Sequence, residues 1–176
     1  MSLNTKKNNL MLPMLMGNVS MKYVDIDDTK NVYRLRTNAE VGKYLARSLD
    51  KSLEEIQQFV ADRMRIDHFF TITTIDTNEF AGTIALWRID LENEYAELGY
   101  EMLPEFQGKG LMDSALKLVL NHAETLNINH IEAKTHLDNL KSRKLVERNG
   151  FILLDGIVDD NNPDNVVYEY KNKTIK

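Results

Sequence analysis

The sequence predicts a mixed α/β fold, in which helices pack around a twisted sheet. Two observations support this prediction. Strand-like and helix-like segments follow the order strand, helices, three antiparallel-looking strands, helix, strand, helix and two strands. Apolar residues make up 43% of the 176 residues, which is enough for the core of one domain without disulfides.

The chain begins with an extension of mixed character. Residues 1–17 join a polar start to a Met- and Leu-rich stretch, LMLPMLMG. We expect this extension to be a short strand laid on the domain, or at its extreme end a loose tail or a cloning remnant. Residues 18–176 are expected to form a single domain.

The first predicted elements are one strand and two helices. Residues 19–26, VSMKYVDI, read as a strand with imperfect alternation. Asp27 and Asp28 mark a helix start, because carboxylates are stabilised near a helix N-terminus. A second helix is expected to begin near Asn38.

A third helix is marked by its cap. Ser52 and Glu55 form a capping box, and the helix that follows should end before His68. Three strands come next, at residues 69–75, 81–89 and 95–103.

The last third of the chain alternates between helix and strand. Residues 111–126 carry apolar residues at the 3.6-residue period over about four turns, and residues 130–136 read as a strand. A further helix starts near Asn139 and ends at Asn149 and Gly150, a good left-handed C-cap pair. Two strands close the chain, at residues 151–158 and 165–171.

Composition excludes several functional classes. The formal charge of -5 argues against a nucleic-acid partner, because phosphate binding needs clustered Lys and Arg. This charge mildly favours a cationic substrate, although ordinary solubility is the plainer explanation. The absence of cysteine removes thiol nucleophiles and redox pairs, and without a signal sequence or apolar span we expect a cytoplasmic protein with no membrane partner.

The segment QGKGLM, residues 107–112, lies between a strand and a helix and is typical of an anion-binding turn. Its two glycines let backbone N–H groups approach an anion at the positive end of the helix. Leu103 and Gly110 stand where a P-loop needs Gly and Ser or Thr, and Asp113 stands where a dinucleotide fingerprint needs Gly. A pyrophosphate fits this turn, although a plain Gly-rich connection explains it as well.

Two longer runs carry a family resemblance. AELGYEMLPEFQGKGLMDSALKLVLNHA resembles motif A of the GNAT acetyltransferases, and NLKSRKLVERNGF resembles their motif B. Together the runs cover about a third of the chain, and GYEMLPEFQGKGLM is most similar to the RimJ/RimL branch. Met112 departs from the usual Gly or Ala at the end of motif A. The resemblance implies the GNAT fold, a mostly antiparallel sheet of about six or seven strands with helices on both faces.

The resemblance also implies acetyl-CoA as cosubstrate and no metal. Its pyrophosphate is expected on the backbone of the turn, its pantetheine arm beside the preceding strand, and Asn139 near that arm. The implied cofactor-binding residues are Met102, Leu103, Gln107, Gly108, Lys109, Gly110, Leu111, Met112 and Asn139.

Direct transfer from a thioester to an amine needs a base for the ammonium and a proton donor for the leaving thiolate. Glu97 resembles the family's base, acting through water, and Glu101 shares its strand face and could take over that role. The two carboxylates would also help to hold a cationic substrate. Ser142 resembles the hydroxyl that protonates coenzyme A. The alternatives are a solvent-facing strand residue for Glu97 and a helix-start residue for Ser142.

Histidines and aromatic residues give weaker signals. His130 and His136 share a strand face but lack a credible third ligand, so we do not expect a metal site. Trp87, Tyr44 and Phe70 are candidates for a substrate pocket or for plain core.

The predicted function is therefore acetyl transfer from acetyl-CoA to a primary amine, with a protein N-terminal α-amine as the first-choice acceptor. The alternatives are a small-molecule amine acetyltransferase, acting on a polyamine, an aminoglycoside or an amino acid, and a non-catalytic coenzyme A sensor. Residues 38–52, 66–70 and 87–97 are expected to build the acceptor cleft. Dimers are common in the family, so a homodimer is compatible with the resemblance.

Overall fold

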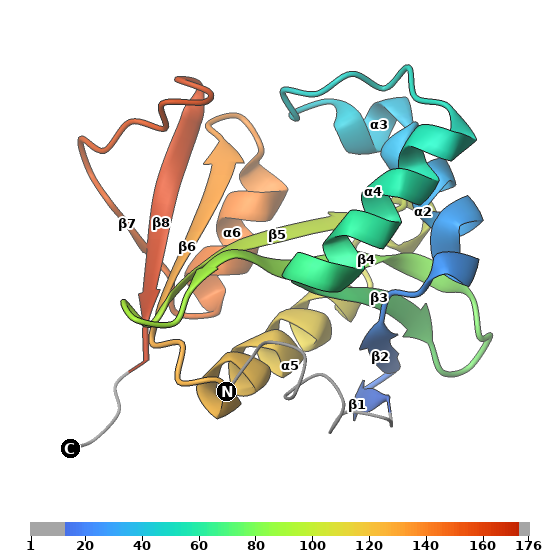
Figure 1. Ribbon diagram of the computed structural model, residues 1–176. Coiled ribbons are helices and arrows are strands. Elements are labelled where there is room, and N and C mark those ends of the chain that lie inside the picture. The colour runs from blue at the N-terminus through green and yellow to red at the C-terminus, as the bar shows by residue number, and fades with distance from the viewer. Residues whose placement is uncertain (1–12, 173–176) are drawn as a thin grey trace.

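The computed structural model describes residues 13–172, which contain one eight-stranded sheet (Figure 1). Its strand order is β1-β2-β3-β4-β5-β6-β8-β7, and every neighbouring pair is antiparallel except β5 and β6. The strands are β1 (Met14–Met16), β2 (Val19–Tyr23), β3 (His68–Thr74), β4 (Phe80–Asp90), β5 (Tyr95–Met102), β6 (His130–His136), β7 (Ile152–Leu153) and β8 (Asn165–Lys171). The predicted α/β class is confirmed, and the short edge strands β1 and β7 raise the strand count above the expected number.

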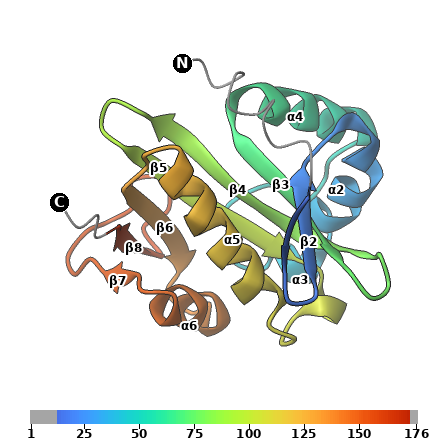
Figure 2. The same cartoon turned by 90° about the horizontal axis from the view of Figure 1, so that it is seen from below.

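Helices cover both faces of the sheet (Figures 1 and 2). Helices α2, α3 and α4 lie on one face, and α5 lies on the opposite face. The helices are α2 (Thr29–Arg36), α3 (Ala39–Gly42), α4 (Leu53–Ile66), α5 (Leu111–Thr125) and α6 (Leu140–Arg148), with short 3-10 turns η1 (Ile26–Asp28) and η2 (Pro104–Phe106). Both hydrogen bonds of the capping box between Ser52 and Glu55 are formed, which confirms the predicted start of α4.

Each helical layer has its own apolar core. The larger core joins α5 to the sheet and includes the fully buried Leu116, Ile84 and Tyr168. The smaller core joins α2 and α4 to the other face through residues such as Val32 and Val60. Burying one such aliphatic side chain contributes about 1.5–3 kcal/mol, so these two layers hold the sheet from both sides.

The strand prediction for residues 151–158 is wrong for most of its length. Within this range, only the two residues of β7 are paired as a strand with β8. The chain then turns away at Gly156, which has φ +75°. Ile157 and Val158 beyond the turn are more than half exposed. The apolar run FILLDGIV therefore predicted a strand that is too long, because the Asp-Gly turn inside the run ends the strand. The first predicted strand likewise ends at Tyr23, because Asp25 caps η1.

The predicted extension is described only from Pro13 onward, and residues 1–12 lie outside the described residues. Its described part includes β1, which pairs with β2 across a turn at Gly17 with φ +56°. No helix within residues 13–172 combines the length and apolar character needed to cross a membrane.

The sheet opens between β5 and β6. The two strands pair only from Tyr95 to Leu98 and from His130 to Ala133. Beyond this point β5 continues beside β4, whereas β6 continues beside β8. The two strands diverge there (Figure 1), and the facing edge of β5 loses its strand partner.

Candidate active site

A cavity of about 1210 Å³ occupies the region where β5 and β6 diverge. Its walls come from the segment containing α2 and α3, from β5 and β6, and from the N-terminal ends of α5 and α6. The predicted site residues that line it are Glu97, Met102, Gln107, Gly108, Leu111, Met112, Asn139 and Ser142. Among the described residues, the predicted Leu103, Lys109 and Gly110 do not contribute to this wall.

Residues 108–113 form a turn with available backbone donors. Gly108 and Gly110 have φ angles of +74° and +75°, a left-handed conformation that costs an L side chain roughly 1–2 kcal/mol. Within the described part of the chain, no acceptor is bonded to the N–H groups of residues 108–113. The first bond of α5 runs from the Ser114 N–H to the Gly110 oxygen at 3.2 Å. Unpaired donors beside a helix N-terminus fit a pyrophosphate.

Gln107 fastens this turn to its neighbours. Its Nε2 donates to the Met102 carbonyl at 3.0 Å, and its Oε1 accepts from Lys141 Nζ at 3.3 Å. Leu103 is fully buried, and its N–H donates to the Ala81 carbonyl at 2.9 Å. These contacts hold the turn against the end of β5 and the start of α6.

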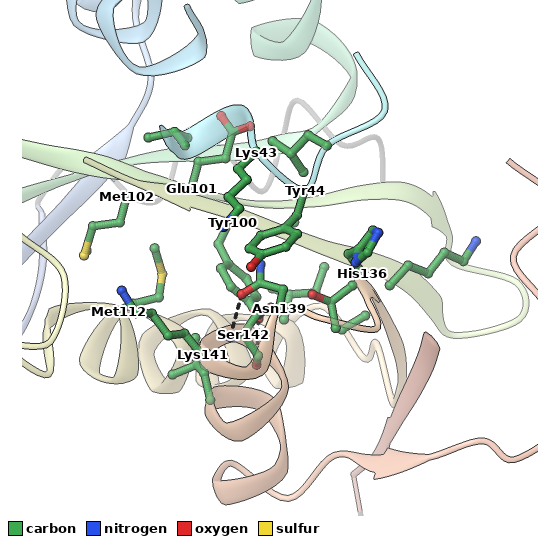
Figure 3. A pocket seen from close by; sticks show the side chains of 18 of the residues that line it. Lys43, Tyr44, Tyr100, Glu101, Met102, Met112, His136, Asn139, Lys141 and Ser142 are labelled. Atoms are coloured by element: carbon green, nitrogen blue, oxygen red, sulfur yellow. Dashed lines mark hydrogen bonds between the residues drawn. The ribbon is translucent and has the colours of Figure 1, made fainter. Parts of the chain in front are cut away.

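A hydroxyl pair lies between β5 and α6. Asn139 caps α6, because its Oδ1 accepts from the Ser142 N–H at 3.2 Å. Ser142 Oγ lies 2.7 Å from the Tyr100 hydroxyl (Figure 3). Burial raises the pKa of Tyr100 to about 12, so this hydroxyl is protonated at neutral pH. Tyr100 was not predicted as a site residue, although it belongs to the GYEMLPEFQGKGLM run that carries the family resemblance.

Glu97 is the centre of an ion-pair network. Arg88 Nη1 and Lys134 Nζ lie 2.8 and 3.0 Å from its Oε1, and the Tyr95 hydroxyl donates to the same oxygen at 3.3 Å. Arg88 has φ +49° at an irregularity in the β4–β5 pairing, the kind of feature that re-aims a side chain. Within residues 13–172, no partner is bonded to the second oxygen of Glu97, Oε2.

Glu101 has cationic partners as well. Arg47 Nη1 is hydrogen-bonded to its Oε1, and Arg36 Nη1 lies 3.9 Å from its Oε2. The sequence suggested two carboxylates able to hold a cationic substrate, but cations from other elements already pair with both Glu97 and Glu101. Nothing in the local sequence identifies those partners, because Arg36 and Arg47 are more than fifty residues from Glu101.

Aromatic side chains wall one side of the cavity. Trp87 and Tyr44 line it, whereas Phe70 is fully buried in the larger core. A Cβ on Gly99 would lie 2.5 Å from the Trp87 ring, so glycine is needed there for the ring to lie across β5. Tyr44 packs against His136 with 5.3 Å between ring centroids (Figure 3).

The two strand histidines have separate environments. His130 Nε2 lies 3.0 Å from Glu169 Oε2 at one end of β6, whereas His136 lines the cavity at the other end. No group of three or more His, Cys, Asp or Glu in the described part of the chain is arranged to hold a metal ion.

The diverging strands, the glycine turn and the hydroxyl pair fit an acyltransferase. Residues 19–152 match the family described as Acetyltransferase (GNAT) domain, and the chain belongs to this family. It is therefore an acetyl-CoA-dependent N-acetyltransferase, as the motifs A and B predicted.

A curated relative supports the RimJ/RimL resemblance, and solved structures share the fold. The ribosomal-protein-serine acetyltransferase of Escherichia coli (strain K12) is 35% identical over 77 residues, which are 43% of each chain. RimL, described as a ribosomal L7/L12 α-N-protein acetyltransferase in complex with coenzyme A, superposes with a TM-score of 0.75 at 23% identity, over 91% of this chain and 97% of its own. Spermidine N-acetyltransferase from Vibrio cholerae, in complex with CoA and spermine, reaches 0.76 at 20% identity, over 86% and 93%. At these identities, the structural likeness shows the fold alone.

Proposed function

We propose that this protein transfers the acetyl group of acetyl-CoA to a protein N-terminal α-amine. The observation that supports the transfer is the cavity between β5 and β6, which has unpaired turn donors at one end and Glu97 with the Tyr100–Ser142 pair further along it. The relatives whose names specify ribosomal proteins support this choice of acceptor. An acceptor of this kind would place the protein in the cytoplasm.

The cosubstrate would lie along the open edge of β5. Its pyrophosphate would accept hydrogen bonds from the unpaired backbone N–H groups of residues 108–112, since the Gln107 N–H already donates to the Pro104 carbonyl at 3.1 Å. Its pantetheine arm carries two amides, and the β5 edge beyond Leu98 has no strand partner, so the arm can pair with this edge as an added strand would. Asn139 lines the cavity on the opposite side of this path.

Direct transfer needs no covalent enzyme intermediate. Glu97 would take a proton from the acceptor ammonium through a water, using Oε2, the oxygen without a protein partner in the described chain. We favour Glu97 over Glu101, because both oxygens of Glu101 face guanidinium groups. Ser142 would donate its hydroxyl proton to the departing thiolate and regain the second proton of the acceptor nitrogen, which that nitrogen loses as the amide forms. The Tyr100 hydroxyl, which burial keeps protonated, would hold Ser142 in place by a hydrogen bond.

A small amine is the second candidate acceptor, because a spermidine acetyltransferase shares this fold. A coenzyme A sensor without turnover is the third. All three proposals place coenzyme A along the same path. They differ in which acceptor, if any, binds on the side of the cavity formed by α2 and α3.

The test is a thiol-release assay with acetyl-CoA, run against N-terminal peptides and a panel of polyamines, aminoglycosides and amino acids. We expect release with peptides and tight coenzyme A binding by calorimetry. Release with small amines alone would move the assignment to the second candidate. Binding without any release would favour the sensor, and a protein that does not bind coenzyme A would contradict the proposal.

A further inference from the structure

The acceptor side of the cavity, defined as its wall from residues 36–47 and the Glu101 face of β5, holds a partly buried guanidinium with unused hydrogen-bond donors. The charged residues of this wall are Arg36, Glu40, Lys43, Arg47, Glu97 and Glu101, of which Glu40 and Lys43 are exposed. Arg36 and Arg47 face a single carboxylate, Glu101. The 3.9 Å between Arg36 and Glu101 is too long for a hydrogen bond. No hydrogen bond is donated by the Arg36 guanidinium to any of residues 13–172. Its side chain is only 18% exposed, so these donors face the cavity more than bulk water.

Arg36 is held firmly in this position. Its guanidinium lies 4.0 Å from the centre of the Phe59 ring, and its carbonyl accepts from Arg47 Nη2 at 3.3 Å. Arg47 Nε is buried without a partner in the described chain. Burial, together with the charges of Arg47 and Arg63, lowers the pKa of Arg36 to about 10 although Glu101 opposes the shift. A buried cation with too little counter-charge favours binding of an anion.

The two partly buried carboxylates of this wall, Glu97 and Glu101, offer little to a second cation on the acceptor, and the third carboxylate, Glu40, is exposed to solvent. Glu97 lies between Arg88 and Lys134, so it too faces two positive groups. An acceptor with several ammonium groups would meet these cations, which disfavours a polyamine. An amine that carries a carboxylate would instead find donors suited to it, since guanidinium binds carboxylate in a bidentate geometry.

The distance along β5 indicates where that carboxylate should be. Glu101 follows Glu97 by four residues on one strand face, which corresponds to roughly 13 Å at the rise of a strand. The carboxylate of a free amino acid shares a carbon with its amine and cannot cover this distance. An extended peptide advances by a similar rise per residue, so an acidic side chain at its second to fourth position can reach Arg36 while the amine lies near Glu97.

We propose that the acceptor is a peptide with an acidic side chain at position two, three or four, and that Arg36, supported by Arg47, binds this side chain. This inference rests on the proposed acetylation of an N-terminal amine. It names a specificity determinant that is separate from the groups assigned to proton transfer.

The test compares peptides that begin with Ser and differ only at position three, as Glu, Gln or Lys. We expect kcat/KM to be about tenfold higher for the Glu peptide than for the Gln peptide, and lowest for the Lys peptide. A matched series with Glu at position two or four locates the optimum, and spermidine and free glutamate complete the panel. Calorimetry with the coenzyme A-loaded protein measures the same preference as binding, independently of turnover.

Arg36→Gln should remove the preference for Glu over Gln, so that the two peptides react with similar kcat/KM. Arg36→Glu should turn the preference toward the Lys peptide. Arg34→Gln is the matched control, because Arg34 lies on the same helix, pairs with Glu105 and is absent from the cavity wall. It should leave peptide preference unchanged, and thermal unfolding checks that all variants are folded.

Equal rates and equal binding for the three peptides would overturn the inference while leaving N-terminal acetylation intact. An Arg36→Gln protein that loses affinity for coenzyme A would also overturn it, because the guanidinium would then serve the cofactor. Acetylation of no peptide and of no other amine would contradict the proposed function itself. In that case, the binding data alone would decide whether the anion preference exists.

Discussion

The two ends of the cavity are built in different ways. The end proposed to bind coenzyme A, called the cofactor end, comes largely from one continuous stretch, from the end of β5 through η2 to the start of α5, joined by the first turn of α6. The acceptor end combines α2, α3, the bulged β4 and β6, which are far apart in the sequence. The cofactor end therefore depends on backbone geometry, whereas the acceptor end depends on side-chain charges that meet across the sheet.

The largest effect is expected at Glu97. Glu97→Gln should lower kcat by about 100-fold or more, because general-base catalysis contributes at least this much, while coenzyme A affinity stays unchanged. Glu132→Gln is the control. Glu132 pairs with Glu97 in the strand register and also accepts from Tyr95, but it is absent from the cavity wall. Similar rates for both variants, in an acetyl-transfer assay, would remove Glu97 from the mechanism.

The next effect concerns the hydroxyl pair. Ser142→Ala should lower kcat by about 30–100-fold, and Tyr100→Phe by about tenfold, because the serine would donate the proton and the tyrosine would position the serine. The double variant should be little worse than Ser142→Ala, since groups that act as a unit are not additive. Pre-steady-state measurement of thiol release distinguishes this pattern from independent losses, which would multiply.

A smaller effect is expected at the cofactor end. Gly108→Ala should weaken coenzyme A binding about tenfold in calorimetry, because a side chain at φ +74° costs roughly 1–2 kcal/mol and shifts the turn away from the conformation that presents its donors. Gly156 has nearly the same φ, +75°, and equally open space for an added methyl group, but unlike Gly108 it does not line the cavity. Gly156→Ala should therefore lower stability to a similar degree and leave the affinity unchanged. An affinity loss in both variants would mean that general destabilisation, and not the turn, is responsible.

The smallest effect is a change of stability with pH. The pKa of Tyr100 rises from 10.0 in the unfolded chain to about 12 in the folded protein, so the folded state keeps a proton that the unfolded state loses. Stability from this group is complete below pH 10 and is lost as the pH rises toward 12. Between pH 9 and 11, wild type should lose about 1 kcal/mol more unfolding free energy than Tyr100→Phe in denaturant titrations. Equal losses of unfolding free energy in the two proteins would contradict the effect of burial on the pKa of Tyr100.

Prediction from sequence succeeded where local physics decides. The strand at residues 130–136, the capped helix after Ser52 and the glycine turn before α5 all match, because periodicity, caps and positive φ angles depend on neighbouring residues. The long strand expected at residues 151–158 was wrong, because an Asp-Gly turn interrupted an apolar run. Tyr100 lay within the recognised motif, yet its role needed the 2.7 Å contact with Ser142, 42 residues away.

By itself, the sequence determined the α/β class, the glycine turn before α5 and the acetyltransferase family, since each depends on consecutive residues. Only the tertiary structure decided how the two carboxylates are paired and which charge the acceptor side presents. The chain has a net charge of -5, yet Arg36 and Arg47 surround Glu101, and Arg88 and Lys134 surround Glu97. Long-range pairing of this kind follows from strand order and helix placement, because these bring side chains together irrespective of their distance along the chain.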